Sequence, residues 1–138
     1  MQAHFRLARP VRDLNRTRDM YCQGLGLRVL GSFLDHQGFD GLMLGRADMH
    51  YHFEFTRCRF HPLAPVSTQE DLMVFYVPDL GQWLQQCEQM LAAGFKPASA
   101  FNPYWNVRGR SFEDLDGYRI VLQNAAWSNA EESPAGAS

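Results

Sequence analysis

The sequence predicts an α+β fold built from two tandem βαβββ units. Three observations lead to this prediction. The motif at residues 11–14 (VRDL) returns at residues 77–80 (VPDL), each copy lying between a short apolar run and an amphipathic stretch. The segment at residues 51–55, which ends the first unit, returns at residues 118–122 at nearly the same offset. Around each copy, the apolar spacing alternates between strand and helix periods, and this gives the element order.

The first unit is predicted to run strand, helix, strand, strand, strand over residues 4–56. Phe5 and Leu7 alternate with His4, Arg6 and Ala8, which indicates the opening strand. A helix should follow, capped by an aspartate and ended by glycines, and then three strands separated by turns. The cap is Asp13, the glycines are Gly24 and Gly26, and the strands are residues 28–33, 41–44 and 51–56.

A proline-containing connector, residues 57–70, leads to the second unit at residues 71–127. Residues 72–77 are apolar throughout, which predicts a strand buried on both faces. Asp79 can cap the second helix, and Gly94 can end it. The stripe expected to face the core is Leu80, Trp83, Leu84, Cys87, Met90 and Leu91. Strands are expected at residues 95–100, 107–114 and 118–123, and a disordered tail at residues 128–138.

Composition limits the class of protein. A chain of 138 residues with 46% hydrophobic composition suits one compact domain, here residues 1–127. A net charge of −2 gives no electrostatic footprint for nucleic acid. No apolar run approaches the roughly 20 residues that a membrane helix needs, and residues 1–6 lack a signal-peptide core. Three widely spaced cysteines fit a reducing compartment, so we expect a cytoplasmic protein without nucleic-acid or membrane partners.

Several motifs resemble the vicinal oxygen chelate superfamily, which holds glyoxalase I, the bleomycin-resistance proteins and the extradiol dioxygenases. They are residues 11–14, 24–27 (GLGL) and 51–56 in the first unit, and 77–80, 93–95 (AGF) and 113–120 (EDLDGYRI) in the second. The resemblance spans nearly everything from Phe5 to Gln123 and is greatest to small bacterial glyoxalase-like proteins. It implies that the two units form a curved, cup-shaped mixed sheet.

The resemblance also implies four metal-ligand positions in the cup, at Arg6, Glu54, Leu72 and Val121. Only Glu54 is a usable ligand, since a guanidinium has no lone pair and the other two side chains have no donor atoms. A catalytic metal needs about three protein ligands. We therefore expect no metal and no cofactor here.

The parity of the strands predicts what lines the cup. One face of the first unit should carry His4, Arg6, His50, His52, Glu54 and Thr56. The second unit should contribute Leu72, Val74 and Tyr76, together with Arg119, Val121 and Gln123. Three interpretations of Arg6 and Glu54 remain open: a buried ion pair that closes the cup, an anion site in which Arg6 binds and Glu54 orients the ligand, or Glu54 as a general base.

One strand could still hold a metal, because His50, His52 and Glu54 share a face. His50 and Glu54 lie roughly 13 Å apart at about 3.3 Å per residue, so all three cannot easily bind one ion. His52 with Glu54, and His4 beside them, remains an alternative to ordinary hydrogen-bonded histidines.

Two aromatic residues, Tyr104 and Trp105, stand in a loop, where they either cap the second sheet or form a wall of the cavity. The sequence therefore predicts a protein that binds a small aromatic or anionic molecule without metal. The predicted ligand-binding residues are Arg6, His52, Glu54, Tyr76, Tyr104, Trp105 and Arg119. The alternatives are a lyase, isomerase or other enzyme, metal-free or with a metal at His52 and Glu54, and an interaction module without a ligand. Exposed sheet edges favour a homodimer. No catalytic residue is assigned.

Overall fold

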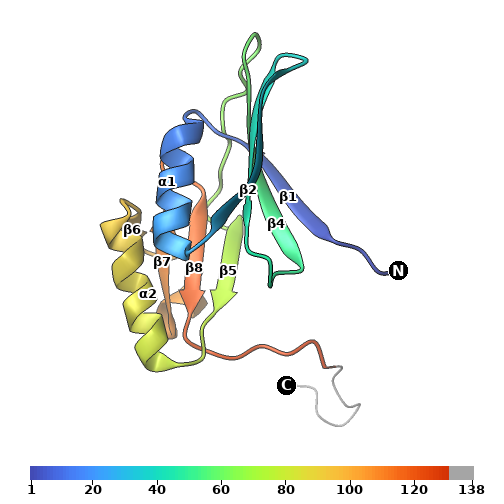
Figure 1. The fold of residues 1–138 in the computed structure, drawn as a ribbon. Coiled ribbons are helices and arrows are strands. Elements are labelled where there is room, and N and C mark those ends of the chain that lie inside the picture. The colour runs from blue at the N-terminus through green and yellow to red at the C-terminus, as the bar shows by residue number, and fades with distance from the viewer. Residues whose placement is uncertain (131–138) are drawn as a thin grey trace.

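The computed structural model describes residues 1–130, which form two βαβββ units in sequence order (Figure 1). The first unit comprises β1 (Phe5–Pro10), α1 (Leu14–Leu25), β2 (Arg28–His36), β3 (Phe39–Gly45) and β4 (Tyr51–Cys58). The second comprises β5 (Leu72–Tyr76), α2 (Leu80–Ala92), β6 (Lys96–Ala98), β7 (Gly109–Glu113) and β8 (Arg119–Gln123), with a short helix α3 (Tyr104–Val107) before β7. The predicted fold class is confirmed.

Each unit builds one four-stranded mixed sheet with the same strand order. The orders are β1-β4-β3-β2 and β5-β8-β7-β6. In both sheets the first strand lies parallel to the last, and the remaining pairs are antiparallel. The duplication seen in the sequence therefore extends to the topology.

The repeated aspartates begin both helices, as predicted. The carboxylate of Asp13 accepts a hydrogen bond from the backbone N–H of Arg16 at 3.0 Å, and that of Asp79 accepts one from Gln82 at 2.9 Å. Each satisfies an amide that the first helical turn leaves free. Gly26 ends α1 in the left-handed conformation, at φ 68°, which favours glycine.

The core lies between the helices and one face of each sheet. α1 and α2 run along the same side of the molecule (Figure 1) and contact each other. Gly24 permits this approach, because a methyl group there would come within 3.0 Å of the Met90 sulfur of α2 and within 2.7 Å of the Phe95 ring that follows it. The largest fully buried side chains are Tyr21, Phe55, Phe112, Leu44, Met90, Ile120 and Leu122.

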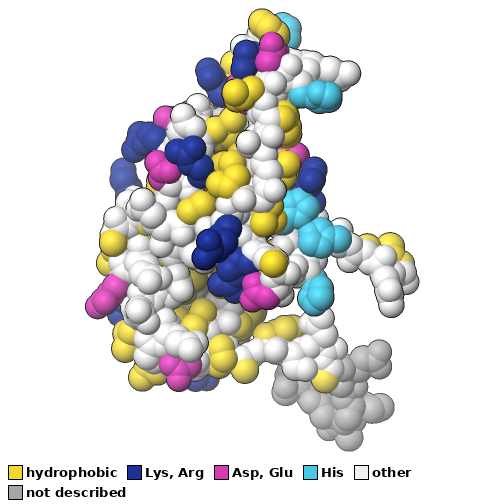
Figure 2. All heavy atoms as spheres, viewed as in Figure 1, with side chains coloured by type: hydrophobic (Ala, Val, Ile, Leu, Met, Phe, Trp, Pro, Cys, Tyr) yellow, Lys and Arg dark blue, Asp and Glu magenta, His cyan; other side chains and the backbone are white. Residues whose placement is uncertain are grey.

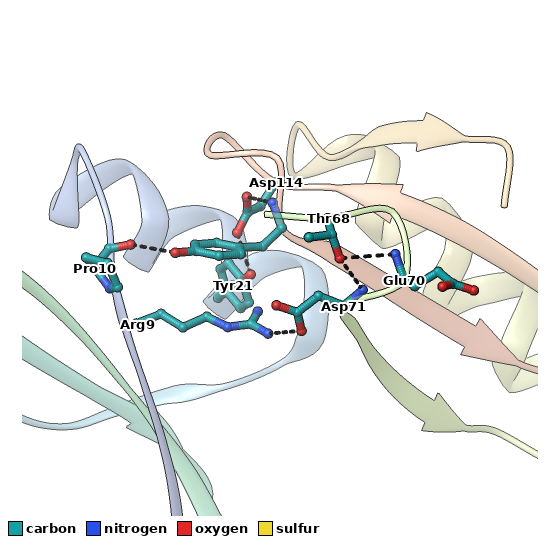
Figure 3. A network of polar contacts seen from close by, with 8 residues as sticks. Arg9, Pro10, Tyr21, Thr68, Glu70, Asp71 and Asp114 are labelled. Carbon is teal, nitrogen blue, oxygen red and sulfur yellow. Dashed lines mark hydrogen bonds and ion pairs between the residues drawn. The ribbon is translucent and has the colours of Figure 1, made fainter. Parts of the chain in front are cut away.

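A polar network fixes the two units relative to each other (Figure 3). The buried Arg9 of β1 donates to Asp71, the residue before β5, at 3.2 Å, and its guanidinium lies 4.5 Å from the centre of the Tyr118 ring. The Tyr118 hydroxyl donates to the carbonyl of Pro10 at 3.1 Å. The fully buried Tyr21 of α1 donates to the Asp114 carboxylate at 2.6 Å. These contacts all join a residue of the first unit to one of the second.

Some local predictions were wrong. β5 is not buried on both faces, because α2 lies on one side of its sheet and α3 covers only part of the other: Met73 is buried, but Leu72 and Val74 are half-exposed and Tyr76 is exposed. Half of the predicted α2 stripe, namely Leu80, Leu84 and Leu91, is exposed. The strand expected at residues 95–100 is shorter, and the one at residues 107–114 starts later, because α3 forms at their junction.

Two expectations concern the rest of the chain. No helix within residues 1–130 is long and apolar enough to cross a membrane. The predicted disordered tail begins at residue 128, and its residues 131–138 lie outside the described part.

Candidate functional site

The face of the first sheet that points away from α1 carries a line of polar side chains. Strands β1 and β4 pair in parallel, with Arg6 opposite His52 and Ala8 opposite Glu54. Phe53 and Phe55 point the other way into the core and are buried. The predicted parity of both strands is therefore confirmed. Figure 2 shows histidine side chains gathered along the open edge of the molecule on this side.

Four of these side chains form a continuous hydrogen-bonded line, which we call the polar chain: His4, His52, Arg6 and Glu54. His4 Nε2 lies 2.6 Å from His52 Nδ1, and the two rings stack with centroids 4.8 Å apart. Arg6 Nε donates to His52 Nε2 at 2.7 Å, and Arg6 Nη1 donates to Glu54 Oε2 at 3.2 Å. His4 and His52 are thus ordinary hydrogen-bonded histidines, as one sequence interpretation held.

The contacts fix the proton positions along the polar chain. A guanidinium can only donate, so His52 Nε2 must accept the bond from Arg6. Neutral His52 then carries its proton on Nδ1 and donates it to His4 Nε2. His4 in turn keeps its own proton on Nδ1. Both hydrogen bonds therefore have the same direction: Arg6 donates to His52, and His52 donates to His4.

The surroundings of His52 favour this neutral form. Partial burial lowers the pKa of His52, and the positive charge of Arg6 lowers it further, against an opposing effect of Glu54. A protonated His52 would also turn a second N–H toward the Arg6 Nε–H and lose the bond between them. Geometry and charge thus agree on a neutral imidazole.

Arg6 retains unused donors. Its Nε and one N–H of Nη1 are occupied, whereas no protein group within residues 1–130 accepts from Nη2. The free Nη1–Nη2 edge matches the two oxygens of a carboxylate or phosphate. The predicted ion pair with Glu54 is present, but it is not buried: the Arg6 side chain is 47% exposed, against 16% for Glu54. It therefore leaves the sheet face open.

The superfamily's metal does not fit these residues. Of the four ligand positions, Arg6 is a cation, and Leu72 and Val121 offer no donor atom. Both ring nitrogens of His52 are already engaged, so it could bind an ion only by giving up Arg6 or His4. Across residues 1–130, no three His, Cys, Asp or Glu side chains are grouped in a way that could hold a metal. Glu54 alone remains, one ligand where about three are needed.

The other predicted residues lie on the second sheet, apart from the polar chain. Trp105 of α3 packs edge-on against Tyr104, with ring centroids 4.9 Å apart, and lines a cavity of about 290 Å³ with Leu72 and Val74. Tyr104 itself is exposed. The ring of Tyr76 lies 5.8 Å from that of Trp127. Trp105 thus covers part of the second sheet and also forms a cavity wall, whereas Tyr104 lines no wall of that cavity.

Arg119 is buried on the second sheet and occupied by protein groups. It donates to the carbonyl of Ser99 at 3.0 Å and to Glu113 at 3.3 Å. Among the described residues, no hydrogen bond or ion pair joins the polar chain to the second unit. The structure therefore brings together His4, Arg6, His52 and Glu54, and leaves the second-sheet residues as a separate group.

Sequence reasoning missed the apolar residues beside the polar chain. Met43 of β3 lies opposite Glu54, and Phe33 of β2 lies opposite Gly41. The available signal was the alternation of Gly41, Met43 and Gly45 in β3, which leaves one face almost bare of side chains.

Comparisons with known proteins identify the family. Residues 5–56 match the YycE-like N-terminal domain, and residues 70–124 match the YycE-like C-terminal domain. The chain is 37% identical over 123 residues to the uncharacterized protein YycE of Bacillus subtilis, covering 89% of this chain and 88% of that protein. The chain belongs to the YycE-like family.

Solved structures agree with this assignment. The crystal structure of Bacillus subtilis YycE, a protein of unknown function described with glyoxalase and fosfomycin resistance proteins, superimposes with a TM-score of 0.86 at 36% identity and 94% coverage of both chains. Glyoxalase I of Leishmania major gives 0.69 at 18% identity, covering 91% of this chain and 88% of its own. TnmS3, an antibiotic binding protein from Streptomyces sp. CB03234, gives 0.62 at 18% identity, covering 89% and 94%. This YycE-like protein thus has the fold of the vicinal oxygen chelate superfamily.

Proposed function

We propose that this YycE-like protein binds a small anionic molecule, aromatic or aliphatic, through Arg6 and without a metal. The proposal rests on the direction of the hydrogen bonds in the polar chain, in which Arg6 donates to His52 and His52 donates to His4. From Arg6 to His4, each free polar atom is a donor, so the ligand must offer acceptors. The one acceptor left on the polar chain is the second oxygen of Glu54.

Each member of the polar chain has a separate role in this proposal. Arg6 binds the carboxylate or phosphate through its Nη1–Nη2 edge, which the protein leaves free. His52 and Glu54 hold the guanidinium from two sides, so the cation does not have to be ordered when the ligand arrives. A hydroxyl or amine on the ligand would find Glu54 as its acceptor.

The second sheet completes the site in a homodimer. We propose that Trp105, with Tyr76 and Tyr104, covers a ligand bound on the first sheet of a second copy, whereas Arg119 holds Ser99 and Glu113 in place behind them. The open polar chain and the half-exposed Leu72 and Val74 support this, because each sheet leaves part of the face that points away from the long helices exposed. The test is the mass in solution by light scattering: a dimer of about 32 kDa, twice the 15.8 kDa chain, is expected.

The three free cysteines fit the cytoplasmic location that we also propose.

Proteins with this fold include some that bind a small molecule and some that are enzymes. The superimposed structures include an antibiotic binding protein as well as an enzyme, glyoxalase I. This likeness shows the fold alone. The choice of binding for this chain rests on its own side chains.

The experiment is calorimetric titration with butyrate and with inorganic phosphate, using the protein and two variants. Arg6→Gln should abolish binding, because the cationic edge is gone. Arg18→Gln, which removes a surface arginine paired with Asp19 on α1, should leave binding unchanged. Anion binding that survives in Arg6→Gln would refute the proposal.

A parallel measurement tests the absence of metal. We expect less than about a tenth of an equivalent of nickel, cobalt, zinc or manganese after exposure of the protein to each ion, since a stable site needs about three ligands. A full equivalent that disappears in Glu54→Ala would show that the polar chain rearranges to hold an ion.

One observation favours catalysis as a second candidate. The Glu54 oxygen without a partner among residues 1–130 stands beside the free edge of Arg6. A carboxylate so placed can take a proton from a bound acid, as a metal-free lyase or isomerase requires. If a turnover is found and Glu54→Gln leaves it unchanged, this candidate fails.

A further inference from the structure

The first sheet presents more than the polar chain on its open face. Cross-strand partners share a face, so the pairing register gives the neighbours of each side chain. One row across the four strands holds Ala8, Glu54, Met43 and Gly31, and the next holds Pro10, Thr56, Gly41 and Phe33. The polar groups of β1 and β4 therefore continue directly into an apolar area on β3 and β2.

Glycines make that apolar area possible. A methyl group on Gly41 would overlap the Phe33 ring, and one on Gly31 would come within 2.8 Å of the Met43 methyl carbon. The side chains of Phe33 and Met43 therefore lie flat against the sheet, over Gly41 and Gly31, and do not project from it. Both are only half-buried, although the ring of Phe33 covers Gly41 fully. Two large apolar side chains thus form a flat, accessible floor.

The charges around this floor are mainly positive. A third row ends in two arginines: Arg6 pairs with His52, Gly45 lies beside His52, and Arg28 pairs with Gly45. Glu54 supplies the one negative charge in these rows and is already paired with Arg6. An occupant of this face would therefore present an acidic group next to an apolar body.

We propose that Met43 and Phe33 bind the hydrophobic part of the ligand whose acidic group is held by Arg6, so the ligand class is an arylalkyl carboxylate. The inference rests on the proposed function, because Arg6 anchors the acid. The spacing supports it: Met43 lies one strand from Glu54 and Phe33 one strand further, each step being about 4.8 Å. A carboxylate joined to a ring by two to four carbons spans that interval.

The experiment compares three related probes by calorimetry: 4-phenylbutyrate, butyrate, which lacks the ring, and 4-phenyl-1-butanol, which lacks the charge. We expect 4-phenylbutyrate to bind roughly tenfold more tightly than butyrate, because it adds a buried ring, and the uncharged alcohol to bind most weakly. Met43→Gln and Gly41→Ala should reduce the affinity for 4-phenylbutyrate about fivefold, by adding a polar group and by displacing the Phe33 ring, and leave that for butyrate unchanged. Leu63→Gln, which changes an exposed connector residue, serves as the control.

The outcomes separate this inference from the proposed function. If butyrate and 4-phenylbutyrate bind equally and Arg6→Gln abolishes both, the acid site stands and the apolar floor is refuted. If neither acid binds, both ideas fail together. If Met43→Gln leaves the selectivity for 4-phenylbutyrate over butyrate unchanged, Met43 does not bind the hydrophobic part of the ligand, and this too overturns the inference, whatever the oligomeric mass.

Discussion

Replacing Tyr21 with phenylalanine should destabilise the protein through one hydrogen bond. The Tyr21 side chain is fully buried, and its hydroxyl is the sole protein partner, within residues 1–130, of Asp114 Oδ2. A hydrogen bond to a charged group contributes about 1.5–3 kcal/mol. The other oxygen of Asp114 keeps its bonds from the backbone N–H groups of Asp116 and Tyr118, so the carboxylate is not left wholly unpaired. We therefore expect a loss of about 2 kcal/mol.

The assay is urea unfolding at pH 7, followed by circular dichroism, with thermal unfolding alongside. A loss of that size should lower the melting temperature by about 6–8 °C for a chain of this length. Tyr51→Phe is the matched control, because Tyr51 is half-buried and its hydroxyl has no hydrogen-bond partner among the described residues. That variant should stay within about 0.5 kcal/mol of the wild type.

The pH dependence makes the test stricter. The bond from Tyr21 lowers the pKa of Asp114, so Tyr21→Phe raises it further. The folded variant then takes up its proton at a higher pH than the wild type does, and the difference in stability should shrink as the pH falls from 7 toward 4. A loss below about 0.5 kcal/mol, or one equal to that of Tyr51→Phe, would refute the assigned role of this bond.

Three other predictions follow from single contacts. Gly24→Ala should destabilise by about 1–2 kcal/mol in urea unfolding, because overlap with the Phe95 ring outweighs the better helix propensity of alanine; a more stable variant would contradict this. Arg6→Gln should raise the pKa of His52 in an NMR titration, since it removes a neighbouring positive charge; an unchanged pKa would contradict the polar chain. Burial raises the pKa of Asp114, so its contribution to stability is present below the unfolded value of about 3.9 and is lost as the pH rises through the folded pKa. Asp114→Asn should abolish that part of the pH dependence, and an unaltered profile would show that Asp114 is not its source.

The sequence was sufficient for the architecture because the information is local and repeated. Asp13 and Asp79 cap helices through amides three residues away, a signal contained in a four-residue motif. Strand parity has a period of two, so the polar face of β4 follows directly from Glu54 and its neighbours.

Periodicity failed where burial depends on what covers a surface. Leu80, Leu84 and Leu91 form an apolar stripe on α2 but are exposed, because spacing defines a face and not its partner. The half-exposed Leu72 and Val74 of β5 are the same case, since α3 covers only part of their side of the sheet. The short helix α3 escaped prediction because it is a single turn that begins after a proline.

The candidate site was predicted as a set of residues and not as a mechanism. Strand parity placed Arg6, His52 and Glu54 on one face, and alignment of the motifs suggested the ion pair. The bond from Arg6 to His52, which fixes the proton positions, joins residues 46 positions apart and depends on tenths of an ångström. No pattern in a single sequence contains such distances. The packing of Met43 over Gly31 and of Phe33 over Gly41 could likewise be predicted only from the cross-strand register.

The replacement of a metal ligand by Arg6 restricts the chemistry open to this protein. A guanidinium supplies positive charge and directed donors, so it can position an acid much as an ion would. It has no vacant coordination position, and therefore it cannot activate water or polarise a carbonyl as a Lewis acid does. What remains to the polar chain is binding, together with proton transfer at the free oxygen of Glu54. The affinity for an acidic ligand should accordingly be the same with and without a strong chelator such as EDTA. If the affinity falls on chelation and returns when metal is added, the positive charge at this face does not come from Arg6 alone.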